Sequence, residues 1–175
     1  FDSKMDRTKG RPIPSGRIFP NTVLKISLIL ILTGSVILIL WTNLLVPALG
    51  LLNLVWYNLV YTLLKRRTPF AIVPGSLVGA IPPAIGWVAA GSLLFDPQII
   101  IIAFFFFIWQ IPHFWLLLLV MDQDYQQAGF PTLTQIFNHA QLSRITFVWI
   151  VSTAVTGLLI PLFGIVSELW INLGL

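Results

Sequence analysis

The chain has 175 residues, of which 57% are hydrophobic and only 9% charged, and its formal net charge is +4. With a mean hydropathy of +0.92, this composition excludes an ordinary soluble domain and a nucleic-acid-binding protein, and it indicates a polytopic membrane protein. There is no cysteine, which excludes disulfides and thiolate metal sites, and two histidines are too few for a His-rich metal site.

Five apolar segments are each about 20 residues long, which is enough for a helix to cross a bilayer. They run over residues 22–42, 44–64, 70–94, 98–121 and 145–166. The sequence therefore predicts an all-α, polytopic membrane bundle of five transmembrane helices, with polar loops at residues 1–20 and 122–144. Because the chain begins without Met and stops directly after an apolar run, we expect residues 1–175 to be part of a longer domain.

The basic residues indicate which side of the membrane each loop occupies. All ten lie on one side if the five segments alternate, whereas Asp96 and Glu168 lie on the other. By the positive-inside rule, the basic side is the cytoplasm or the mitochondrial matrix. We expect a bacterial inner membrane in preference to a mitochondrial one.

The second and third segments carry polar and helix-breaking residues that a simple lipid-facing helix does not need. Asn53, Tyr57, Tyr61 and Lys65 recur at four-residue spacing, which predicts one polar stripe along a helix. An aromatic belt with a snorkelling lysine would explain Tyr61 and Lys65, but Asn53 lies deeper. The prolines and glycines of the third segment predict a kinked helix that packs inside protein, with Gly75 and Gly79 at a close helix contact.

The fourth segment contains the run WQIPHF at residues 109–114, in which an amide and an imidazole flank a proline at mid-membrane depth. Such groups are expensive in lipid, so we expect Gln110 and His113 to face a cavity or a ligand. If the helix continues beyond residue 121, its period places Gln110, His113 and Asp124 on one face. A hydrogen bond from His113 to a neighbouring helix is the alternative, and His139 is expected to be a solvated loop residue.

Each of the two polar loops carries a pair of carboxylates, Asp2 and Asp6 in the first and Asp122 and Asp124 in the second. Carboxylate oxygens suit Mg²⁺, which is commonly held by a few carboxylates together with substrate phosphates. Nearby Arg and Lys side chains can hold phosphate oxygens and stabilise a departing diphosphate. With an apolar span beneath, the pattern is typical of a site for a polyprenyl diphosphate, although solvated loop charges would also explain it.

The run DSKMDRTKGRPIPSGR at residues 2–17 resembles the end of the first Asp-rich motif of UbiA-type intramembrane prenyltransferases. Four further motifs resemble the branch of that family that farnesylates protoheme IX: YTLLKRRTP at 61–69, GAIPPAIGW at 79–87, WQIPHF at 109–114 and DYQQAGFP at 124–131. The resemblance implies nine transmembrane helices around a central chamber, of which this chain would supply helices three to seven and would be inactive alone. The family's first motif has an Asn, an acidic residue and an Asp at four-residue intervals; only the last is present here, at Asp2.

The resemblance also implies roles for individual residues in a transfer of farnesyl from farnesyl diphosphate to a vinyl group of protoheme IX, which gives heme O and diphosphate. Mg²⁺ would be the cofactor and heme a substrate. The implied metal ligands are Asp2, Asp122 and Asp124, with Asp6 less favoured because the family varies there. Diphosphate contacts fall on Arg7, Arg11, Lys65 and Arg66, and further catalytic positions on Tyr125 and again Lys65. The heme and prenyl pocket would be lined by Asn53, Tyr57, Tyr61, Trp109, Gln110 and His113.

Two other functions compete with this hypothesis. A related enzyme could prenylate a quinone precursor or another ring, and a transporter or channel could use the broken third segment and the buried Gln and His as a path. The Asp and Arg clusters favour a Mg²⁺-dependent reaction of a diphosphate instead. The sequence does not identify an enzyme partner in heme biosynthesis.

Overall fold

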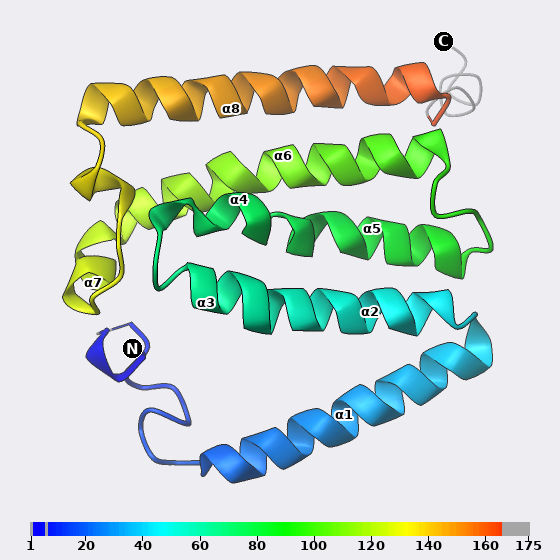
Figure 1. Ribbon diagram of the computed structural model, residues 1–175, viewed down its shortest axis with the longest axis horizontal. Coiled ribbons are helices and arrows are strands. Elements are labelled where there is room, and N and C mark those ends of the chain that lie inside the picture. The colour runs from blue at the N-terminus through cyan, green and yellow to red at the C-terminus, as the bar shows by residue number, and fades with distance from the viewer. Residues whose placement is uncertain (1, 6, 166–175) are drawn as a thin grey trace.

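The computed structural model describes residues 2–5 and 7–165, which leaves Asp6, Glu168 and the end of the last predicted span outside the described residues. Five helical spans are long and apolar enough to cross a membrane: Pro20–Trp41, Leu45–Leu64, Pro69–Ala89, Pro97–Val120 and His139–Phe163. They follow one another side by side (Figure 1), and the described residues include no strand. The predicted all-α bundle of five transmembrane helices is confirmed, and the protein is a multi-pass membrane protein.

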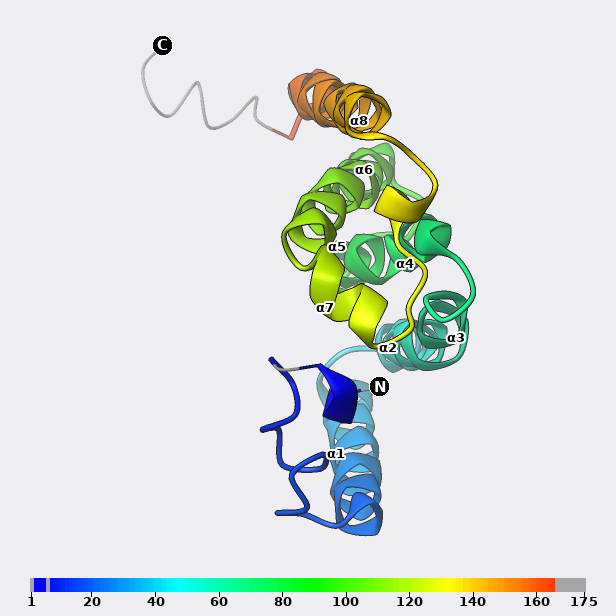
Figure 2. The ribbon, with the colours of Figure 1, turned by 90° about the vertical axis from the view of Figure 1, so that its left-hand side faces the viewer.

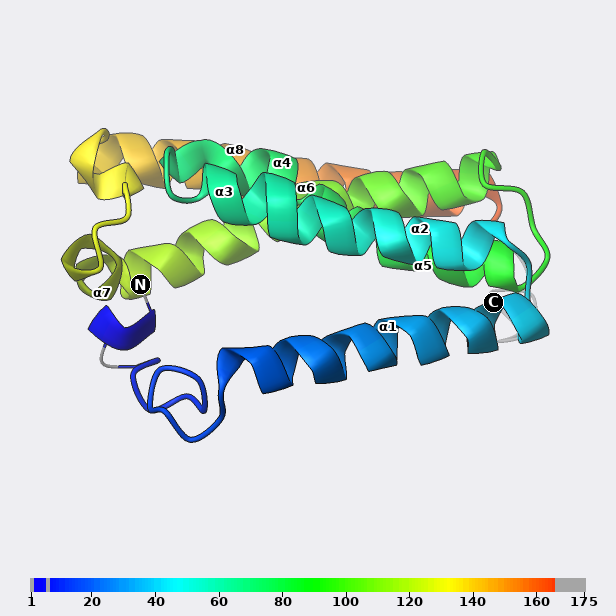
Figure 3. The same ribbon diagram turned by 60° about the horizontal axis from the view of Figure 1, so that its bottom comes forward.

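The first span, α1 (Pro20–Trp41), contacts mainly α2 and has no buried residue. It begins with a proline, whose missing N–H is harmless in the first helical turn. Figure 2 looks along the helices and Figure 3 views them from below; both show α1 set apart from the other spans. An apolar helix that is exposed all round suits contact with lipid or with further membrane helices.

The second span consists of α2 (Leu45–Val55), a π-helical segment (Trp56–Tyr61) and α3 (Thr62–Leu64). Asn43 caps its start, because the Asn43 Oδ1 accepts hydrogen bonds from Leu45 N and Val46 N at 3.0 and 3.2 Å. The π-helical segment was not predicted from the sequence. Such segments widen a helix locally and occur frequently at functional sites.

The third span is interrupted, as its prolines and glycines predict. A 3₁₀ turn (Pro69–Ala71) leads into α4 (Ile72–Gly75), and α5 (Leu77–Ala89) follows after Ser76. It ends before residue 94 because Gly91 adopts a φ of +92°, a conformation open to glycine but costly for other residues. Inside α5, Pro82 cannot donate to the carbonyl of Val78; Asn53 Nδ2 donates to that carbonyl instead, at 3.3 Å.

The fourth span, α6 (Pro97–Val120), packs between α5 and α8 and has more buried residues than any other described element. Ile111 and Trp115 from α6 are buried against Ile72, Leu133 and Leu142 from its neighbours. Beyond Met121, the short α7 (Asp122–Gln127) runs on as a separate helix.

The fifth span begins earlier than predicted, at His139, where α8 (His139–Leu159) starts and leads into a 3₁₀ turn (Ile160–Phe163). Asn138 and Gln141 explain this boundary, since each side chain accepts a hydrogen bond of 2.9 Å from the other's backbone N–H. The predicted second loop therefore contains α7 and the first turns of α8. His139 is exposed, as expected, but it lies on a helix.

Candidate functional site

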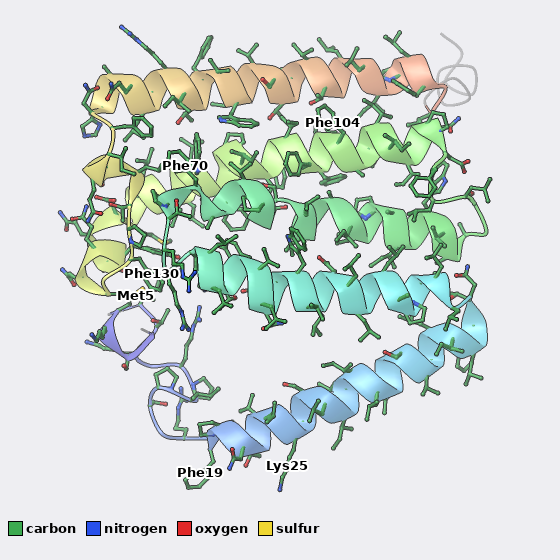
Figure 4. The ribbon with its side chains drawn as sticks, in the orientation of Figure 1. Met5, Phe19, Lys25, Phe70, Phe104 and Phe130 are labelled. Atoms are coloured by element: carbon green, nitrogen blue, oxygen red, sulfur yellow. The ribbon has the colours of Figure 1, made fainter. Side chains whose placement is uncertain are left out.

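The two polar loops meet at one end of the bundle. Met5 of the first loop is 5% exposed and packs against Ala128, Phe130 and Tyr125 of the second. Figure 4 shows Met5 and Phe130 pointing toward one another below α7. Asp2 begins the short 3₁₀ helix Asp2–Lys4 in the same segment. Apolar contact between the loops thus draws together the regions that carry the predicted metal ligands.

A hollow lies next to this junction, between the start of the third span, the end of α6, α7 and the loop that follows α7. Trp115 forms part of its wall, and its polar lining comes from Tyr61, Lys65, Thr68, Asp122, Tyr125 and Thr132. Lys65 Nζ lies 5.6 Å from the centroid of the Tyr61 ring, within the range of a cation–π contact. The ammonium group of Lys65, the carboxylate of Asp122 and the two tyrosine rings therefore line one opening, which we call the mouth.

A second, deeper hollow of about 100 Å³ continues from the first, because both are lined by Tyr61 and Ile72. Its wall is largely apolar, and its polar side chains are Tyr57, Tyr61 and Gln110. The Tyr57 and Tyr61 ring centroids are 5.6 Å apart. We call these two hollows together the chamber. It runs from a charged mouth at the loops to an amide at mid-membrane depth, which suits a ligand with an anionic head and an apolar tail.

Two glycines let side chains lie close to the backbone of the third span. A Cβ at Gly75 would be 2.5 Å from Tyr61 Cδ2, and one at Gly79 would overlap Gln110 Oε1 and lie 2.7 Å from Gln110 Cδ. The predicted close contact at Gly75 and Gly79 is thus confirmed, but what each glycine admits is a side chain of the chamber.

Asp122 sits at the centre of a hydrogen-bonded network that joins α7 to the loop after it. Its Oδ1 accepts from Thr134 Oγ1 and its Oδ2 from Gln126 Nε2, both at 2.7 Å. Gln126 Nε2 also donates to Thr132 Oγ1 at 3.2 Å, and the two threonine hydroxyls are 2.9 Å apart. We call Asp122, Gln126, Thr132 and Thr134 the loop clasp. It fixes the chain that carries Phe130 over the chamber mouth.

Asp124 faces a different hollow, an outer one of about 550 Å³ that Asp122, Thr134 and His139 also line. None of the side-chain hydrogen bonds among the described residues engages Asp124, so its oxygens keep their acceptor capacity. No three acidic or histidine side chains in the described part of the chain cluster as a metal site. Two carboxylates still fit Mg²⁺, provided that diphosphate oxygens complete its shell.

The shared face predicted for Gln110, His113 and Asp124 is wrong. His113 stacks on Trp109, with ring centroids 4.9 Å apart and planes at 13°, in a groove between α6 and α8. Gln110 lies on the flank toward α5 instead. Helix α6 ends at Val120, so the change of direction at Met121 removes the phase relation to Asp124.

The remaining predicted residues fall into two groups. Asn53 does not line the chamber: its amide donates to Val78, and its buried Oδ1 has no partner among the described residues. Arg7, Arg11 and Arg66 are exposed. They belong to the first loop and to the end of α3, which lie at the same end of the bundle as α7 (Figure 1).

Sequence reasoning missed Trp115, Phe130 and the threonines of the loop clasp. Trp115 is 3% exposed, and its indole Nε1 has no hydrogen-bond partner among the described residues. Nothing in its apolar surroundings singled it out. A signal for the clasp was present, because Thr132 and Thr134 follow the helix-stopping residues Gly129 and Pro131 and precede another polar residue.

The protein is a helical membrane bundle with an apolar chamber that opens among lysine, aspartate and tyrosine side chains. The model of the UbiA prenyltransferase family matches residues 1–175, and the chain belongs to this family.

Curated relatives agree with this assignment. The chain is 39% identical to a protoheme IX farnesyltransferase of Geobacter sulfurreducens over 95% of its length and 62% of the relative's. It is 34% identical to the Nitratidesulfovibrio vulgaris enzyme of that name over 99% of the chain and 60% of the relative. It is 44% identical to a protoheme IX farnesyltransferase of Azorhizobium caulinodans over 76% of the chain and 43% of the relative. The chain thus spans about six tenths of the length of the first two, and no solved structure matches it.

Proposed function

We propose that the protein transfers a farnesyl group from farnesyl diphosphate to a vinyl group of protoheme IX, and that this chain acts as part of a longer protein, since the relatives it matches are longer. The names of those relatives and the match along the whole chain support the acceptor and the donor. The observation that carries the proposal is the chamber itself, with a charged mouth and an apolar interior. That form fits a diphosphate head on an isoprenoid chain.

At the mouth, Lys65 holds diphosphate oxygens, and Arg66, Arg7 and Arg11 add positive charge from the same end of the bundle. Asp124 and Asp122, with Asp2 from the first loop, would hold Mg²⁺, which neutralises the diphosphate as it leaves. Asp122 is the carboxylate that lines both the mouth and the outer hollow that Asp124 faces, so a metal ion between the two carboxylates would lie at the edge of the mouth. Asp122 already accepts two hydrogen bonds, which leaves more free acceptor capacity on Asp124.

In the interior, Tyr61 and Tyr57 present aromatic faces beside the path of the chain. These faces stabilise the allylic cation that forms when the carbon–oxygen bond to diphosphate breaks, and the apolar walls exclude water from it. The vinyl group of protoheme IX then attacks the cation, and water adds to the resulting carbon with loss of a proton. Tyr125, at the mouth, lies beside the departing diphosphate.

His113 and Trp109 line an apolar groove of about 420 Å³ on the flank of α6 opposite the chamber. A porphyrin whose vinyl group meets the cation in the chamber lies on the Gln110 flank, so we do not assign these two residues as porphyrin contacts. We further propose a bacterial inner membrane, with the basic end of the bundle in the cytoplasm.

The proposal is tested by expressing the full-length protein in a host that lacks its own heme farnesylating enzyme, and by analysing extracted heme by mass spectrometry. Farnesylated heme, absent from the empty-vector control, is the expected product. Unmodified protoheme alone would refute the proposal. A prenylated quinone precursor in its place would favour the related-enzyme alternative.

A further inference from the structure

We propose that Gly79 determines how long a prenyl chain the chamber accepts, by giving the Gln110 side chain a recess against the backbone of α5. This inference rests on the proposed function and deepens it. The contact between Gly79 and Gln110 is so close that no side chain larger than hydrogen at residue 79 leaves Gln110 where it is.

The geometry distinguishes this glycine from its neighbours. A Cβ at Gly79 would overlap Gln110 Oε1, which is the far end of a flexible side chain. At Gly86, on the same helix, a Cβ would meet nothing within 4 Å. A methyl group at residue 79 therefore has one main effect, the displacement of the Gln110 amide, whereas one at residue 86 has none.

The displaced amide has the chamber beside it as free space. Gln110 lines the deeper hollow together with Tyr57, Val78 and Phe114, and its position against Gly79 keeps that hollow open. The deeper hollow holds only about 100 Å³, so the loss of even part of it matters. Since the diphosphate is held at the mouth, the far end of the isoprenoid reaches the Gln110 level, and a longer chain is obstructed more than a shorter one.

Gly75, one turn or about 6 Å nearer the mouth, has a comparable role for Tyr61. A Cβ there would lie 2.5 Å from Tyr61 Cδ2 and 3.0 Å from Cε2. An aromatic ring yields less easily than an amide, so Gly75→Ala carries a greater risk of misfolding. Gly79→Ala is therefore the better probe.

The experiment compares full-length wild type, Gly79→Ala and the matched control Gly86→Ala, each with protoheme IX and with either farnesyl or geranyl diphosphate as donor. We expect Gly79→Ala to lower the ratio of farnesyl to geranyl kcat/KM by about tenfold, the scale on which pockets discriminate chain length, and Gly86→Ala to leave it unchanged. The amount of each variant in the membrane and its thermal midpoint are measured in parallel. Equal ratios in wild type and in a folded Gly79→Ala would overturn the inference.

A second variant separates the recess from any other effect of the methyl group. If the methyl group at residue 79 acts by displacing Gln110, then the double variant Gly79→Ala/Gln110→Ala has the same donor ratio as Gln110→Ala alone. A tenfold difference between these two variants would refute the mechanism. Absence of farnesylated heme with the wild type would instead refute the proposed function, so the two failures are distinguishable.

Discussion

The loop clasp makes a quantitative prediction about Asp122. Both of its carboxylate oxygens accept hydrogen bonds of 2.7 Å, one from Gln126 and one from Thr134. A hydrogen bond to a charged group contributes roughly 1.5–3 kcal/mol, and partial exposure places these two at the low end. Asp122→Ala should therefore lower the free energy of unfolding by about 3 kcal/mol.

An exchange of acceptor and donor tests whether the hydrogen bonds carry that stability. Asp122→Asn replaces one of the two acceptor oxygens with an NH₂ group, which then faces the donor of Gln126 or of Thr134, and the substitution should cost about 1.5 kcal/mol. Adding Gln126→Glu restores one donor and one acceptor. It also keeps the negative charge, moved to residue 126, so the double variant should regain most of the loss.

The assay is thermal unfolding of full-length protein in detergent, followed by tryptophan fluorescence. Recovery of stability in the double variant would support the conclusion that the hydrogen bonds of the loop clasp stabilise the fold. A double variant no more stable than Asp122→Asn would refute the reasoning. Heme farnesylation by the same two variants reports separately on the metal role, because only that role requires the charge at residue 122.

Three further predictions concern other contacts of the bundle. Asp124→Asn should reduce farnesyl transfer about a hundredfold, because a metal ligand is lost. Membrane insertion should be unchanged, because this carboxylate makes no side-chain hydrogen bond in the described part of the chain. Near-normal turnover by this variant would contradict the metal role of Asp124. Asn53→Ala should lower the free energy of unfolding by about 1 kcal/mol, because the carbonyl of Val78 loses its hydrogen-bond donor. Adding Pro82→Ala should restore stability, because residue 82 then has a backbone N–H that can donate to the same carbonyl. Thermal unfolding midpoints of the single and double variants measure both effects. Met5→Asp should release the first loop from the second, because a carboxylate replaces the apolar side chain that joins them. Limited trypsin digestion should then cleave faster at Arg7. The control is that the variant reaches the same amount in the membrane as the wild type.

The spans could be predicted from the sequence because the cost of placing polar groups in lipid depends on composition along the chain. The interruption of the third span could be predicted for the same kind of reason, since Pro and Gly act on their own backbone. The π-helical segment at Trp56–Tyr61 could not, because no residue type in it signals such a segment.

Helical spacing placed the candidate site residues only in part. Tyr57, Tyr61 and Lys65 lie in contact along one stripe, as their spacing predicts. Asn53 has the same spacing, yet its amide compensates for a proline on another helix. Which partner a polar side chain finds depends on the neighbouring span, and helical period does not contain that information.

By itself the sequence determined that the described part of this chain contains five membrane-spanning segments, with acidic and basic loops at one end, because those properties follow from local transfer energies and charge. Only the tertiary structure decided which flank of α6 faces the chamber. Gly79 admits Gln110 on one side, the stack of Trp109 and His113 takes the other, and the break at Met121 separates both from Asp124. Packing between helices sets these directions, and it is a property of pairs of helices rather than of any one of them.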